Sequence, residues 1–126
     1  MKILIAEDDI FLGNALRVKL TNDSNEVTLA KDGAEAIVEL EKSVFDLILL
    51  DIVMPEKNGF EVLEAVKLST KNKKTPVAMI SNLGQSEDVE KAKKMGAIDF
   101  IVKSNVSLAE LSEKIKSLIK LPHAPK

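Results

Sequence analysis

The 126-residue sequence contains no cysteine, no tryptophan, no tyrosine and only one histidine. The lack of cysteine excludes disulfide bonds and every metal site built from thiolates. The single histidine, His123, lies in a tail flanked by prolines with no second ligand-type residue nearby, so we do not interpret it as a metal ligand or as a phosphorylated residue. A metal site in this chain therefore has to use oxygen ligands, which select a hard cation.

The sequence also lacks a long apolar run and a strong charge of either sign. No segment is long enough to cross a bilayer, and the first apolar run, residues 2–6, is too short for the core of a signal peptide. We therefore expect a cytoplasmic protein with no membrane partner. A formal charge of −2 argues against direct binding of nucleic acid, which depends on basic surfaces. The length favours one domain.

Short apolar runs alternate with amphipathic stretches along the whole chain. The runs predict strands at residues 2–6, 26–30, 46–50, 76–80 and 98–102, each followed by apolar residues at helical spacing. Five such units predict an α/β fold in which helices cover both faces of a parallel sheet, and right-handed crossovers make it doubly wound. Capping-box spacings begin three of the helices: Asp32 with Glu35, Asn58 with Glu61, and Ser107 with Glu110.

Polar side chains follow four of the five expected strands. Glu7, Asp8 and Asp9 come after the first strand, and Asp51 comes directly after the third. Ser81 and Lys103 follow the fourth and fifth strands. Because ligands of doubly wound sheets bind at the carboxyl ends of the strands, we expect these groups to share one site. Each residue alone is weak evidence, and Asp9 alone reads equally well as a helix cap.

The chemistry of this group is coherent. Clustered carboxylates repel one another unless a cation is present, and Mg²⁺ binds through one or two carboxylates together with water and phosphate oxygens. An aspartate can act as a nucleophile and form an acyl phosphate. Lys103 can pair with Asp51 at rest and with a phosphate oxygen afterwards, and Ser81 can donate a hydrogen bond to another.

Several of these segments together resemble the receiver domain of bacterial two-component response regulators, in a single-domain form like the chemotaxis regulators. They are Glu7-Asp8-Asp9, Leu49-Leu50-Asp51, Met54 to Gly59, Ser81 and Val102-Lys103. The resemblance implies a flavodoxin-like (βα)5 fold with strand order 2-1-3-4-5. It covers residues 1–121 and leaves 122–126 as a short tail. We expect a stand-alone receiver slightly more than a piece of a longer regulator.

The resemblance also implies a role for each site residue. Asp51 accepts the phosphoryl group from a sensor histidine kinase or a histidine phosphotransfer protein, and Lys103 and Ser81 assist. Mg²⁺ is held by Asp8, Asp9, Asp51 and the backbone carbonyl of Val53. Ser81 and Phe100 switch the surface formed by helix 4, strand 5 and helix 5, which controls a downstream protein of unknown identity. The chain is then no enzyme beyond its own phosphorylation and dephosphorylation, and is a monomer or a weak phosphorylation-dependent dimer.

Two residues depart from the family pattern. Ser104 follows Lys103 where the family usually has proline, often after a cis peptide bond. A cis bond before a residue other than proline costs about 2.5–4 kcal/mol, so we expect a trans bond or a rearranged loop. Asn82 stands where the family prefers a small residue, and its bulk is expected to narrow donor access or alter the lifetime of the phosphoryl group.

Two other functions fit parts of the sequence. An aspartyl phosphatase commonly carries a second aspartate two residues after the nucleophile, but this chain has Val53 there. A docking domain that has lost phosphorylation would explain Asn82 and Ser104 but not the intact set of site residues. The lysines at 71, 73 and 74 are interpreted as a solvated loop.

Overall fold

The computed structural model describes residues 1–82 and 85–120. His123 and the tail predicted at 122–126 lie outside the described residues. The strands are β1 (Lys2–Ala6), β2 (Glu26–Ala30), β3 (Leu47–Asp51), β4 (Val77–Ser81) and β5 (Asp99–Val102). The helices are α1 (Ile10–Asn22), α2 (Gly33–Lys42), α3 (Gly59–Leu68), α4 (Ser86–Lys94) and α5 (Leu108–Lys120), with a 3-10 turn, η1 (Lys103–Asn105), before α5.

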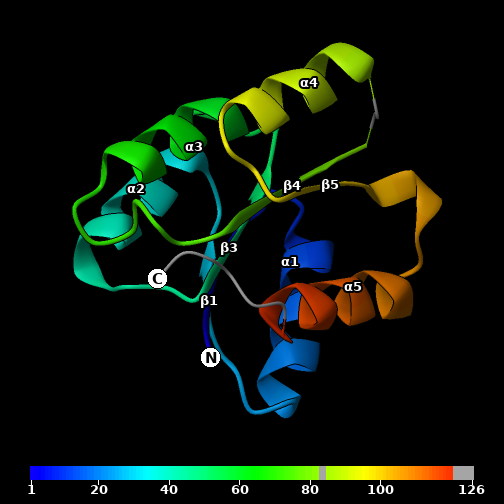
Figure 1. The fold of residues 1–126 in the computed structure, drawn as a ribbon. Coiled ribbons are helices and arrows are strands. Elements are labelled where there is room, and N and C mark those ends of the chain that lie inside the picture. The colour runs from blue at the N-terminus through cyan, green and yellow to red at the C-terminus, as the bar shows by residue number, and fades with distance from the viewer. Residues whose placement is uncertain (83–84, 121–126) are drawn as a thin grey trace.

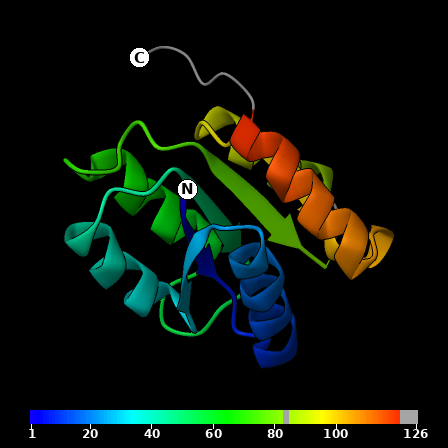
Figure 2. The same ribbon diagram turned by 90° about the horizontal axis from the view of Figure 1, so that it is seen from below.

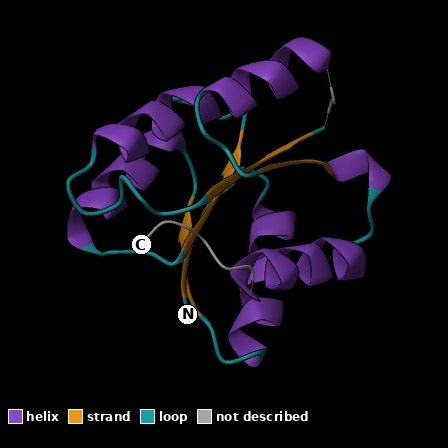
Figure 3. Ribbon diagram, viewed as in Figure 1, coloured by secondary structure: helices purple, strands orange, loops and turns teal. Residues whose placement is uncertain are grey.

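All neighbouring strands pair in parallel in the order β2-β1-β3-β4-β5, which confirms the doubly wound fold and the predicted strand order. Figure 3 shows the strands in orange with helices on both sides of them. The last three strands begin one residue later than predicted, and β3 and β4 also end one residue later. Asp51 and Ser81 are therefore the final residues of their strands, because Asp51 still pairs with Ile80 and Ser81 with Val102. Both side chains are fixed by the sheet itself.

The sheet separates two apolar cores (Figures 1 and 2). One core joins the sheet to α2, α3 and α4, and the other joins it to α1 and α5. Successive side chains of a strand point to opposite faces of the sheet. In β3, Ile48 and Leu50 therefore lie in the first core, and Leu47 and Leu49 lie in the second. All five residues of β3 are buried, as predicted for a central strand.

The helix ends follow the local signals in the sequence. Asn58 and Glu61 form the predicted capping box, with two reciprocal hydrogen bonds of 2.9 Å. Ser107 and Glu110 do the same at 2.8 and 3.1 Å. Asp32 accepts a hydrogen bond from the Glu35 amide at 2.8 Å, as predicted, but the Glu35 carboxylate accepts from the Lys31 amide rather than from that of Asp32.

Gly59 sets how closely α3 begins to the end of β3. A Cβ atom built there would lie 2.4 Å from the carbonyl oxygen of Asp51 and 2.8 Å from Cα of Ile52. Only a residue without a side chain permits this approach. The capped start of α3 is thereby held against the strand end that carries Asp51.

Asn72 is a fully buried polar residue. It joins two loops at the edge of the sheet opposite the carboxyl ends of the strands. Its side-chain oxygen accepts from the Phe45 amide at 2.9 Å and from the Thr75 hydroxyl at 3.1 Å. Its side-chain amide donates to the carbonyl oxygens of Leu40 at 2.9 Å and Ser43 at 2.8 Å.

Replacing Asn72 with alanine is expected to lower the free energy of unfolding by about 3 kcal/mol, because buried backbone groups lose their partners and each costs about 1–3 kcal/mol without full additivity. Urea unfolding followed by far-UV circular dichroism measures the change. The matched substitution Asn14→Ala, at an exposed position of α1, is expected to change stability by less than about 0.5 kcal/mol. A loss below about 1 kcal/mol in Asn72→Ala would show that water replaces the lost hydrogen bonds.

Candidate functional site

The sequence-predicted site residues meet at the carboxyl edge of the sheet, around a pocket of about 340 Å³. Its lining comprises Asp8, Asp9, Asp51, Ile52, Val53, Ser81, Asn82, Asp88 and Lys103. Of the residues that the sequence placed at the site, Glu7 and Phe100 lie outside this lining. The loops after β1, β3, β4 and β5 all contribute, which is the arrangement expected for a parallel sheet.

Lys103 joins two buried carboxylates in the centre of the site. Its Nζ lies 2.7 Å from Oε1 of Glu7 and 3.1 Å from Oδ2 of Asp51. The Glu7 side chain is 0% exposed, and Asp51 as a residue is 5% exposed. A single ammonium group therefore faces two acids that have almost no access to water.

The burial of Asp51 has a direct consequence for its protonation. Removal from water raises the pKa of the Asp51 carboxyl, and hydrogen bonding to Glu7 and its negative charge raise the pKa further, to about 7. Lys103 opposes this shift but does not cancel it. Burial works to lower the pKa of Lys103, yet the two carboxylates outweigh it and raise that pKa. Without a further cation, the single positive charge of Lys103 cannot balance the carboxylates of both Glu7 and Asp51.

Three carboxylates converge closely enough to hold one metal ion. One oxygen from each of Glu7, Asp8 and Asp51 lies within 4.8 Å of the other two. Oε1 of Glu7 is buried and, within the described residues, has no hydrogen-bond partner apart from its ion pair with Lys103. Such a set of oxygen atoms fits a hard divalent cation.

Asp9 behaves differently from the other two acids of the run. Its carboxylate caps α1 and accepts a hydrogen bond from the Leu12 amide at 3.2 Å, while its own amide donates to Oε2 of Glu7 at 3.0 Å. The first turn of a helix has amides without partners inside the helix, and Asp9 satisfies one of them. The carboxylate cluster thus contains Glu7 and not Asp9, and the predicted ligand set of Asp8, Asp9, Asp51 and the Val53 carbonyl stays a prediction.

The remaining predicted residues take distinct places. Ser81 is 5% exposed at the end of β4, and Val53 is 73% exposed at the pocket. Phe100 lies on β5, half-buried against the core beneath α4. Asn82 is exposed, and its carbonyl accepts a hydrogen bond from the Ser104 hydroxyl at 3.4 Å. The peptide bond before Ser104 is trans, as predicted, and η1 begins at Lys103.

Sequence reasoning missed the roles of two residues. Glu7 directly follows β1, whose last four residues are buried, and its amide continues the ladder to the carbonyl of Ala30, so its position at a strand end was a usable signal. Asp88 lies in the first turn of α4 and reaches the pocket only because of how α4 lies on the sheet. Nothing in the local sequence marks it.

The family model described as the response regulator receiver domain matches residues 3–116. This chain belongs to that family. The transcriptional regulatory protein CiaR of Streptococcus pneumoniae is 38% identical over 120 residues, which cover 95% of this chain and 52% of CiaR. The chain thus spans about half the length of this curated relative.

Solved structures of receiver domains share the fold. The non-phosphorylated HemR receiver domain of Leptospira biflexa is 30% identical with a TM-score of 0.89, over 99% of this chain and 98% of that one. The receiver domain of the sensor histidine kinase PA1611 of Pseudomonas aeruginosa, 23% identical with a TM-score of 0.81, covers 95% of this chain and 98% of its own. That domain is described with a magnesium ion coordinated in its active-site cleft.

The chain is therefore a phosphorylation-activated receiver domain of the kind found in response regulators. Receivers of this family are phosphorylated by histidine kinases and act on downstream targets, and their acidic pocket binds a divalent metal. Among the described residues, no helix has the length and apolar character needed to cross a bilayer.

Proposed function

We propose that Asp51 is the phosphoryl acceptor of this receiver. The observation that carries the proposal is its position as a buried carboxylate at the end of β3, 3.1 Å from the Lys103 ammonium and within a three-carboxylate cluster. A carboxylate in this position is a nucleophile whose charge is balanced from one side by lysine.

In the proposed reaction an Asp51 carboxylate oxygen forms a bond to phosphorus. The bond between phosphorus and the imidazole nitrogen of a phosphohistidine breaks, and that nitrogen keeps the electron pair. Lys103 offsets negative charge on the transferring group, and the Ser81 hydroxyl donates a hydrogen bond to one of its oxygens. The acyl phosphate later loses its phosphoryl group to water. We propose no turnover of another substrate, because Val53 stands where an aspartyl phosphatase has its second aspartate.

Mg²⁺ is the metal we propose for the acidic pocket, held by Asp8, Asp51 and the backbone carbonyl of Val53, with Glu7 beside them. The bound ion would neutralise the excess of carboxylates and stabilise charge on the phosphoryl group. The magnesium site of the PA1611 receiver domain supports this choice. Asp9, which the sequence analysis included, is the alternative ligand, and it would have to leave the α1 cap.

Substitution of the two acids separates these possibilities. Asp8→Asn is expected to weaken Mg²⁺ binding by about tenfold or more, because it removes a ligand charge from the cluster. Asp9→Asn is expected to change it by less than about threefold, since asparagine is an equally good helix cap. Isothermal titration with MgCl₂ measures both. If Asp9→Asn weakened Mg²⁺ binding more than Asp8→Asn did, Asp9 would be the metal ligand and Asp8 would lie at the rim of the pocket.

Phosphorylation is proposed to act on Ser81 and Phe100 and through them on the surface of α4, β5 and α5. The sheet links the two residues: Ser81 pairs with Val102, two positions after Phe100 on β5. α4 is the helix best suited to move, because Ala92 is its only buried residue and no side chain caps its start. A sensor histidine kinase or histidine phosphotransfer protein is the proposed donor. A protein is the proposed target.

Mass spectrometry of the intact protein tests the proposal. Incubation with a small phosphodonor such as acetyl phosphate and Mg²⁺ is expected to add one phosphoryl group, and EDTA is expected to prevent the addition. Fluorescence is unsuitable, because the chain has no tryptophan or tyrosine. Absence of the adduct at every time, with rapid quenching to exclude fast hydrolysis, would instead support a docking domain that has lost phosphorylation.

A further inference from the structure

A second charged surface lies away from the phosphorylation site. Residues 67–74 contain four lysines and residues 91–94 contain three, with no acidic residue in either range. We call these seven side chains the lysine face. They contribute +7 to a chain whose formal charge is −2, so the remaining residues carry −9. The molecule is therefore strongly polarised.

The structure brings the two groups of lysines together. The last turn of α3 and the end of α4 lie on the same face of the sheet (Figure 1). Lys67 reaches from α3 to the end of α4, because a Cβ built on Gly96 would lie 3.0 Å from Cε and 3.1 Å from Nζ of Lys67. The lysines at 71, 73 and 74 follow α3 directly, since the Lys73 amide donates to the Ser69 carbonyl at 3.0 Å, so they lie at the same end of α3 as Lys67.

The lysine face is unneutralised. All seven side chains belong to exposed residues. Within residues 1–82 and 85–120, none of them lies within 4.0 Å of a carboxylate, whereas seven other lysines do. Cations near helix C-termini are favourable on their own, but that effect explains the lysines of the last helical turns and not those of the loop at 71–74.

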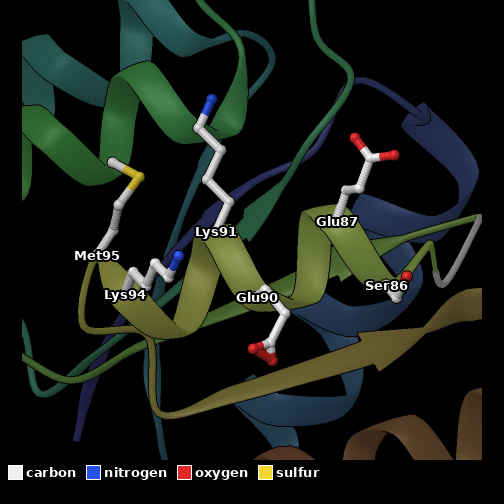
Figure 4. A pocket seen from close by; sticks show the side chains of 6 residues that line it. All are labelled: Ser86, Glu87, Glu90, Lys91, Lys94 and Met95. Carbon is white, nitrogen blue, oxygen red and sulfur yellow. The ribbon is translucent and has the colours of Figure 1, made fainter.

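Apolar groups lie among these charges. Lys91 stacks over the ring of Phe60 at 4.3 Å from its centroid, which holds its ammonium over α3. Met95 is half-buried and lines a groove of about 500 Å³ along α4, and Leu68, next to Lys67, is 78% exposed. Figure 4 shows Lys91, Met95 and Glu87 extending to one side of α4 and Glu90 to the other.

We infer that the lysine face is a docking surface for an acidic protein segment. Charge complementarity identifies the partner as anionic. The groove along α4 also contains Glu87 and Glu90 in its N-terminal half, opposite in sign to Lys91 and Lys94. These acids repel a uniform polyanion such as nucleic acid or an anionic bilayer, while a protein segment carries the mixed charges and apolar side chains that match the whole groove.

The location of the surface keeps this docking compatible with phosphorylation. α3 begins beside Asp51, and Lys67 is the ninth of its ten residues, about 12 Å further along the helix. A partner held by Lys67 and Lys94, near the C-terminal ends of α3 and α4, leaves the acceptor pocket open. The inference therefore stands independently of the role proposed for Asp51.

Charge reversal tests the inference, with a short peptide that combines several glutamates with leucines and one lysine as the probe. The double variant Lys67→Glu and Lys94→Glu is expected to bind the probe about tenfold more weakly than wild type, because each reversed contact turns attraction into repulsion. The control variant Arg17→Glu and Lys19→Glu makes the same change in net charge on α1 and is expected to lose less than about twofold. Amide NMR shifts are expected to concentrate in residues 67–74 and 91–97 and to diminish with added salt.

Three results would overturn it. Equal losses in both variants would show a response to net charge alone. If the wild-type protein did not bind the probe even at low salt, the lysine face would not be a docking surface. Equally tight binding at the same residues by duplex DNA or by phosphatidylserine vesicles, each compared at equal charge, would assign the surface to a polyanion instead. Circular dichroism of both variants confirms that each remains folded.

Discussion

Replacing Asp51 with asparagine is expected to abolish phosphoryl uptake completely while leaving the fold intact. The amide has almost the same shape as the carboxylate but is no nucleophile, so the acyl phosphate cannot form. Asparagine also keeps an oxygen that can accept from Lys103, which lies 3.1 Å from the Asp51 carboxylate. The effect is all or none, and intact mass after incubation with acetyl phosphate and Mg²⁺ measures it directly.

The matched control for this experiment is Asp88→Asn. Asp88 lines the same pocket, so its substitution removes one pocket carboxylate without touching the acceptor. This variant is expected to take up one phosphoryl group, as wild type does. If Asp51→Asn still acquired the group, the acceptor would lie elsewhere, and peptide mapping of the adduct would identify it. Loss of uptake in both variants would point to pocket charge rather than to the nucleophile.

The stability of the metal-free protein is expected to fall as the pH rises from about 4 to about 7. The folded-state pKa of Asp51 is raised from 3.8 to about 7, first by burial and then by Glu7. In this window the folded protein holds a proton that the unfolded chain has already released. Stability therefore decreases with pH, by up to about 1.4 kcal/mol per pH unit for one proton. Below the window both states hold the proton, and above it neither does.

Urea unfolding in EDTA at a series of pH values measures this slope. Asp51→Asn is expected to remove most of it and to stabilise the metal-free protein above pH 7, because Glu7 then has Lys103 to itself. Asp46→Asn, at an exposed position, is expected to keep the wild-type slope. An unchanged slope in Asp51→Asn would assign the titration to another group.

Added Mg²⁺ is expected to reverse the trend at high pH. An ion that binds only the folded protein stabilises it by mass action, and the carboxylates that bind it must be ionised. The same acids that destabilise the metal-free protein at neutral pH therefore give the metal its affinity. This links the stability experiment to the metal assignment of Asp8.

Much of the fold could be predicted from the sequence because its signals are local and redundant. The alternation of five apolar runs with helical stripes determined the α/β class, and the capping boxes at Asn58 and Ser107 formed as their spacing indicated. Strand boundaries were less certain, because whether Asp51 and Ser81 still belong to a strand depends on pairing with residues far away in the chain.

The candidate site was predictable in outline for a topological reason. Parallel strands place all their carboxyl ends at one edge of the sheet. The acids, the hydroxyl and the lysine that follow different strands therefore had to lie close together. Which atoms touch could not be predicted in the same way. Whether Asp8 or Asp9 joins the carboxylate cluster depends on one backbone turn at the start of α1, and the contact of Lys103 with Glu7 depends on the conformation of η1.

By itself, the sequence determined the elements and the residues at the strand ends, because both follow from periodicity, capping chemistry and strand topology. The strand order came from the resemblance to receiver domains. Only the tertiary structure decided how the charges are shared. It buried Glu7 with Asp51 against one lysine, left Asp9 at a helix cap, and brought Lys67 of α3 to the end of α4. The physical reason is that charge interactions depend on distances and burial between residues far apart in the chain, which no local pattern encodes.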